Sequence, residues 1–244
     1  MTSAEGSSIG LPPTSPAVPY SHIRAQLDTG DLFFLHTTSA AGVMIERLEH
    51  YAGLPPYSHI AMVIKDGNAL YLWDAPGGGD CFLDPYEPDS DNRIHSSPVH
   101  TGCRVSVLDD VLAYYATKVD VRGFWVRQLT PPVSQDRFAA LRTFINRVDG
   151  LPFLVQFGYS ELFANFLAGR EGDSLYFGTY FCSQLVADSY MHMGLLRMDH
   201  LPPNAYTPAA FANRSLPLVP PARLGDVFFV TWDRPTGGGI HCDQ

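Results

Sequence analysis

The chain has 244 residues, of which 45% are hydrophobic and 17% charged, a balance typical of a soluble globular protein with one sizeable domain or two small ones. Its 16 basic and 25 acidic residues give a formal charge of -9, and no basic cluster occurs. Nucleic-acid binding requires concentrated Lys and Arg, so this composition argues against a polyanionic partner.

The ends of the chain differ from its middle. Segment 1–20 is rich in Ser, Pro and Gly and lacks both the basic start and the apolar stretch of a secretory signal, so we expect a flexible or loosely attached arm. We expect a single domain over 21–235 and a C-terminal tail over 236–244. No stretch approaches the roughly 18 apolar residues of a membrane-spanning helix. These features predict a cytoplasmic protein.

Short strands and helices alternate along the chain without a regular period. Strands are predicted at 31–37, 58–64, 69–75, 104–108, 124–129 and 225–233, and helices at 39–53, 134–150, 159–169 and 182–194. Ser134 is the predicted cap of the best-marked helix. The strings TGDLFFL (29–35) and LGDVFFV (224–230) are interpreted as two similar strand starts rather than a repeat. The pattern predicts an α+β domain with a mostly antiparallel sheet.

Segment 58–76, SHIAMVIKDGNALYLWDAP, predicts a β-hairpin. Asp66-Gly67 is typical of a two-residue type I′ loop, because Gly accepts the positive φ of that turn. Counting back from this loop places His59 directly opposite Asp74 on a mostly apolar face. Opposed side chains lie close enough for an imidazole and a carboxylate to hydrogen-bond. A buried pair of this kind is either structural or put to chemical use.

Cys182 begins the helix predicted at 182–194 and the apolar stripe along it. A helix N-terminus stabilises a thiolate, and its first N–H groups point to where an oxyanion develops during acyl transfer. The helix therefore offers a candidate nucleophile, and the hairpin offers a candidate base with an acid to orient it. A buried structural thiol is the alternative interpretation.

Three motifs together resemble the circularly permuted papain-like amidases of the YaeF/YiiX group, relatives of NlpC-type cell-wall peptidases and lecithin:retinol acyltransferase-like proteins. The motifs are a strand beginning Ser-His, an acidic residue fifteen positions later, and the late helix Tyr-Phe-Cys-Ser-Gln-Leu-Val; the resemblance covers roughly residues 28–212. It implies a permuted papain-like (NlpC-like) fold, with a small antiparallel sheet packed against helices. We expect no cofactor, and we expect no metal site, since the ligand types of HCDQ (241–244) fall on the predicted tail.

The resemblance also assigns roles to residues. It implies that Cys182 is the nucleophile, His59 the general base and Asp74 the third polar residue, at a position where Glu is usual. The candidate oxyanion and cleft residues are Tyr180, Ser58, Tyr57 and Ser183. Packing is the alternative role for Tyr180, and packing at the start of the strand is the alternative for Ser58 and Tyr57.

The implied activity is that of a cysteine hydrolase acting on an amide or ester bond of a small peptide, muropeptide, amino-acid amide or N-acyl substrate through an acyl-cysteine. The alternatives are acyl transfer to an amine or alcohol and a non-catalytic binding module that has lost turnover. His192 lies about 280° around the helix from Cys182 and is a poor partner. His200 and His241 lie in Pro- or Gly-rich segments that do not clearly offer the downstream strand of a papain-like order. The residues interpreted as surface, packing or inert groups are His22, His36, His50, His95, His100, Cys81, Cys103 and Cys242.

Overall fold

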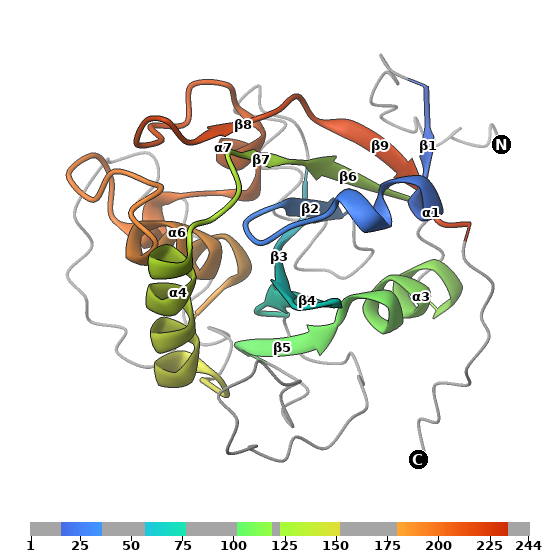
Figure 1. The fold of residues 1–244 in the computed structure, drawn as a ribbon, viewed down its shortest axis with the longest axis horizontal. Coiled ribbons are helices and arrows are strands. Elements are labelled where there is room, and N and C mark those ends of the chain that lie inside the picture. The colour runs from blue at the N-terminus through green and yellow to red at the C-terminus, as the bar shows by residue number, and fades with distance from the viewer. Residues whose placement is uncertain (1–15, 36–56, 77–101, 119–122, 152–179, 234–244) are drawn as a thin grey trace, which may run out of the picture.

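The computed structural model describes residues 16–35, 57–76, 102–118, 123–151 and 180–233 (Figure 1). Within them a seven-stranded sheet has the order β1-β9-β6-β2-β3-β4-β5. All neighbouring strands are antiparallel except the pair β1–β9, which confirms a mostly antiparallel α+β arrangement. The strands of this sheet are β1 (Val18–Pro19), β2 (Leu32–Leu35), β3 (His59–Asp66), β4 (Ala69–Asp74), β5 (Arg104–Val107), β6 (Gly123–Arg127) and β9 (Phe228–Thr231).

Helices pack on both faces of the sheet (Figure 1). Helices α4 (Gln135–Val148) and α6 (Cys182–His192) pack on one face, and α3 (Leu108–Lys118) packs on the other beside α1 (Tyr20–Ile23) and η1 (Arg24–Gln26). Alternate residues of β3 contact the two layers, so nearly the whole strand is buried. This explains its continuous apolar run. The remaining short elements are β7 (Leu129–Thr130), β8 (Arg223–Leu224), η2 (Pro203–Ala205) and α7 (Pro208–Ala212).

Most of the predicted elements that fall on described residues are confirmed, but one helix was not predicted and the end of the predicted arm is packed on the sheet. Helix α3 was not predicted, because it follows β5 without a loop and no turn residue marks its start. The arm predicted over 1–20 is not loose at its end, since Val18 and Pro19 pair with β9 and Tyr20 is fully buried. The helices predicted at 39–53 and 159–169 and the tail 236–244 lie outside the described residues.

The two similar strings form strands that flank the same neighbour. Strands β2 and β9 both pair with β6, and the register gives their aromatic pairs the same partners. Phe33 and Phe228 both lie opposite Val126, while Phe34 and Phe229 both lie opposite Trp125. Both strings therefore form strands, as predicted, and the two strands pair with the same residues of β6 from opposite sides.

The β3–β4 hairpin forms, but its predicted register is wrong by two residues. Asp66 pairs with Ala69, so the loop is Gly67-Asn68 rather than Asp66-Gly67. Gly67 has φ of 59°, and both loop positions of a type I′ turn require a positive φ, which Gly and Asn both tolerate. In this register Asp74 faces Ala61 instead of His59. Because side chains alternate between faces with a period of two, a two-residue shift leaves every side chain on its predicted face.

Helix α6 is held to the sheet by buried hydrogen bonds as well as by apolar packing. The indole Nε1 of Trp73 in β4 donates to the Ser189 hydroxyl at 3.0 Å, and that hydroxyl donates to the Leu185 carbonyl at 2.7 Å. The Tyr190 hydroxyl donates to the Gly30 carbonyl just before β2. These bonds fix the position and rotation of α6, and hence the place of its first residue, Cys182.

Removing the Ser189 hydroxyl should destabilise the protein, because the buried Trp73 N–H would lose its acceptor. We expect Ser189→Ala to lower the free energy of unfolding by about 1 to 3 kcal/mol in urea denaturation. Ser183→Ala on the same helix is the matched control, since the buried Ser183 hydroxyl has no hydrogen-bond partner among the described residues. Equal losses in the two variants would contradict this account.

Candidate active site

The three predicted catalytic residues converge at the ends of three elements. His59 is the first residue of β3, Asp74 the last of β4 and Cys182 the first of α6. Their exposed fractions are 6%, 0% and 4%. Strands β3 and β4 are neighbours in the sheet, and α6 packs on both. The fold therefore brings together a thiol, an imidazole and a carboxylate in a nearly dry environment.

His59 and Asp74 interact across the hairpin even though they are not directly opposed. The imidazole Nε2 lies 3.2 Å from Asp74 Oδ2. Diagonal neighbours on one face of a sheet lie within reach of long or aromatic side chains, and the histidine ring covers this diagonal. An ionised carboxylate only accepts hydrogen bonds, so Nε2–H is the donor and Nδ1 is left for another partner.

A fourth residue, Arg104, completes this network and was not predicted. It is the first residue of β5, pairs directly with Asp74 in the strand register and is fully buried. Its Nε donates to Asp74 Oδ1 at 3.2 Å. Burial, the largest influence, raises the pKa of Asp74, but the positive charge of Arg104 and the contact with His59 outweigh it and leave that pKa below its ordinary value. Asp74 is therefore a buried carboxylate held ionised from two sides.

Cys182 interacts with the imidazole of His59. Burial is the largest influence on the pKa of His59 and lowers it, but the charge of Cys182, the hydrogen bonds to Asp74 and to Cys182, and the charge of Asp74 together raise that pKa to about 10. The imidazole thus has both the thiol and the carboxylate as partners. A base that serves a nucleophile and is oriented by an acid needs these two contacts.

The N-terminus of α6 presents backbone donors beside the thiol that have no acceptor within the helix. Phe181 is the N-cap residue and its side chain makes no capping hydrogen bond. The first intrahelical bond in this turn runs from the Leu185 N–H to the Phe181 carbonyl. The N–H groups of the first turn have no acceptor within the helix, and the helix dipole makes this end favourable for negative charge. An oxyanion formed on a group bound to Cys182 would lie next to these donors.

Tyr180 stabilises the segment before Cys182 through a hydrogen bond with α6. Its hydroxyl donates to Asp188 Oδ2 at 2.8 Å, and its ring packs edge-on against Phe144 of α4. Asp188 also lies 3.2 Å from His192, whose other ring nitrogen is bound by Arg147. The Tyr180 hydroxyl therefore has a structural partner, which matches the packing alternative.

The other predicted cleft residues also have structural contacts. The Ser58 hydroxyl donates to the Leu35 carbonyl in β2 at 3.2 Å. The Tyr57 ring packs on Phe34 at 4.9 Å and lies 5.7 Å from Trp125, so both residues fit packing at the start of β3. Ser183 is buried in the first turn of α6.

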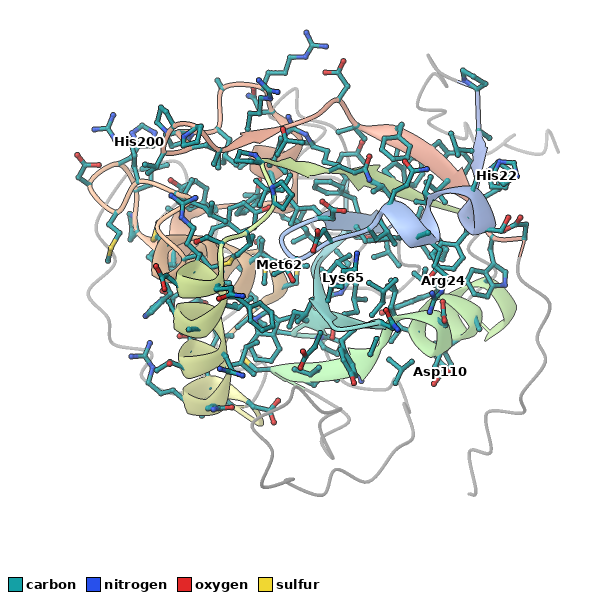
Figure 2. The ribbon with its side chains drawn as sticks, in the orientation of Figure 1. His22, Arg24, Met62, Lys65, Asp110 and His200 are labelled. Atoms are coloured by element: carbon teal, nitrogen blue, oxygen red, sulfur yellow. The ribbon has the colours of Figure 1, made fainter. Side chains whose placement is uncertain are left out.

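The remaining described histidines lie away from this constellation, whereas Cys103 directly precedes Arg104 in the chain. Figure 2 shows His22 and His200 on opposite sides of the molecule, both apart from Met62 of β3. His192 is occupied by Arg147 and is stacked on Phe144 at 4.3 Å between ring centroids. Cys103 is fully buried, and burial, the largest influence, raises the pKa of its thiol well above the ordinary range, as an inert thiol requires. The other predicted rivals lie outside the described residues.

Comparisons with known proteins find a weak structural similarity. No family model and no curated protein matches the chain. The fold is similar to the crystal structure of the metalloprotein YiiX from Escherichia coli O157:H7, with 16% identity and a TM-score of 0.45 over 86% of this chain and 99% of that one. Among the described residues, no group of three or more His, Cys, Asp and Glu is arranged to hold a metal ion. No helix in the same part of the chain is long and apolar enough to cross a bilayer.

The contact between Cys182 and His59 predicts how the imidazole titrates. Cys182→Ala removes the charge of Cys182, the largest of the influences that raise the pKa of His59, so we expect that pKa to fall. NMR titration of the His59 ring measures this directly. Cys103→Ala is the control and should leave the titration unchanged. An unaltered His59 midpoint in Cys182→Ala would show that the two side chains do not interact.

The Tyr180–Asp188 hydrogen bond predicts a loss of stability on removal of the hydroxyl. Because the acceptor is a carboxylate, Tyr180→Phe should lower the free energy of unfolding by about 1.5 to 3 kcal/mol in denaturant titration. Tyr206→Phe serves as the comparison, since the buried Tyr206 hydroxyl has no hydrogen-bond partner among the described residues. A Tyr180→Phe variant as stable as wild type would contradict the assigned contact.

Proposed function

We propose that this protein is a cysteine hydrolase with a circularly permuted papain-like fold, which cleaves an amide or ester bond through an acyl-cysteine. The observation that carries the proposal is the buried series Cys182, His59, Asp74, with the thiol at an uncapped helix N-terminus. Cys103 provides an internal contrast, because it is equally buried but lies beside the C-terminal end of α4, through backbone hydrogen bonds with Gly150 and Leu151, and not at a helix N-terminus.

Acylation follows from the order of these groups. With Nε2 bound to Asp74, Nδ1 of His59 takes the thiol proton, and Sγ of Cys182 forms a bond to the substrate carbonyl carbon. The carbonyl oxygen becomes an oxyanion beside the first-turn N–H groups of α6. His59 then gives its proton to the leaving amine or alcohol as the bond from carbon to that group breaks, and the acyl group remains on Cys182.

Deacylation uses the same groups in reverse. His59 removes a proton from water as the water oxygen attacks the acyl-cysteine carbonyl. The bond between carbon and sulfur breaks, the thiolate regains its proton from His59, and the carboxylic acid leaves. Asp74 holds the ring orientation through both half-reactions and stays ionised throughout. No redox step and no co-reactant other than water is needed.

The substrates proposed are small peptides, muropeptides, amino-acid amides or N-acyl compounds. A test that needs no knowledge of the natural substrate uses a fluorescent iodoacetamide at neutral pH, with the labelled residue identified by mass spectrometry. We expect Cys182 to label much faster than Cys103, and His59→Ala to slow Cys182 labelling by about 100-fold or more. His200→Ala, a change in an exposed histidine apart from β3, should label like the wild type.

Turnover is then measured with p-nitrophenyl acyl esters. The proposal predicts an initial burst and an acyl mass increment on the Cys182 peptide, both absent in Cys182→Ala. An added amine that captures the acyl group in preference to water would identify a transferase instead. Slow labelling of Cys182 at the rate of Cys103, with no acyl adduct, would overturn the proposal in favour of a binding module.

A further inference from the structure

We infer that Arg104 is a positioning residue of this site, which orients the Asp74 carboxylate and balances its charge so that His59 can work as a base; this inference rests on the proposed function. The inference is based on geometry: the two oxygens of the Asp74 carboxylate bind different partners. Oδ1 accepts from Arg104 Nε at 3.2 Å, and Oδ2 lies 3.2 Å from His59 Nε2. With one oxygen fixed by Arg104, the other is directed at the imidazole.

The strand order makes this arrangement rigid. Asp74 lies in β4 between β3, which carries His59, and β5, which carries Arg104. Asp74 and Arg104 are paired residues in the β4–β5 ladder, and the side chains of both are fully buried. The guanidinium is planar and keeps its charge when buried, whereas a lysine ammonium is a flexible point charge that loses its proton more readily.

The charges of the four groups explain why a buried arginine is needed. When the thiol proton has moved to the imidazole, Arg104 and His59 are positive and Asp74 and Cys182 are negative, so the buried network is neutral. Without Arg104 the same state carries a net negative charge in a nearly dry environment, which is costly. Arg104 therefore permits a carboxylate beside His59 without an uncompensated charge.

Among the described residues, the ionisable side chains with a direct contact to Asp74 are Arg104 of β5 and His59 of β3. Cys182 of α6 interacts with His59 in turn. The nearby Cys103 thiol is neutral, because burial raises its pKa. A change in how Asp74 titrates can therefore be attributed to Arg104 or to His59.

The test replaces Arg104 and follows two signals as pH is lowered: the Asp74 carboxyl by ¹³C NMR and the rate of Cys182 alkylation by iodoacetamide. In Arg104→Met we expect the Asp74 midpoint to rise by about 1 to 3 pH units, because burial is no longer opposed by a positive charge. The pH at which Cys182 alkylation falls off on the acid side should rise by a similar amount. Arg104→Lys, which retains a charge, should restore both signals toward the wild type.

Two further variants keep the test decisive. Arg104→Gln retains a donor but no charge and carries the same expectation if Arg104→Met does not fold. Arg127→Met is the matched control, because Arg127 is also buried but, among the described residues, donates to backbone carbonyls, including those of Phe211 and Gly225. It should leave the Asp74 midpoint unchanged.

Each result has a defined meaning. An unchanged Asp74 midpoint in Arg104→Met and Arg104→Gln, or an equal rise in Arg127→Met, would overturn the inference. A selective rise in the Asp74 midpoint supports it. If that rise occurs while Cys182 alkylation is insensitive to both Arg104 and His59, the charge balance around Asp74 stands and the proposed hydrolase function fails.

Discussion

A single buried carboxylate constrains the rest of this site. Asp74 has no exposed surface, so its charge is tolerated only because Arg104 and His59 both bind it. These partners come from the strands on either side of β4, and the ladder hydrogen bonds hold all three at fixed separation. The imidazole orientation that proton transfer to and from Cys182 requires is therefore a consequence of strand pairing and charge balance.

The second constraint is the placement of α6. Cys182, its first residue, contacts His59 only if the helix keeps its position and its rotation over β3 and β4. The Trp73–Ser189 hydrogen bond and the hydrogen bond from Tyr190 to Gly30 fix both the position and the rotation. The hydrogen bond from Tyr180 to Asp188 also holds the segment before Cys182 to α6. Buried hydrogen bonds are directional where apolar contacts are not, which makes them suited to holding a helix end beside a reactive ring. The core thus supports the chemistry as well as the fold.

Parts of this site could be predicted from the sequence, for reasons particular to each residue. The His59–Asp74 contact survived a wrong loop assignment because a two-residue shift preserves the faces of both strands. The apolar stripe predicted that Cys182 begins a helix. The resemblance to a known family linked Cys182 to His59, which lies more than a hundred positions away. Arg104 could not be placed, since it lies thirty positions from Asp74 and a strand register can be predicted from sequence only across a short loop. The hydroxyl of Tyr180 was equally unpredictable, because its partner is fixed by the packing of α6.

The central claim is that the Cys182 sulfur and the His59 imidazole are neighbours able to exchange a proton. The most direct test is reaction with 1,3-dibromoacetone, whose three-carbon chain joins a thiol to an adjacent ring nitrogen, followed by peptide mapping by mass spectrometry. The account predicts a bridge between the Cys182 and His59 peptides, formed in the folded protein and absent after unfolding in urea. Alkylation of Cys182 without a bridge, or a bridge to any other residue, would contradict it.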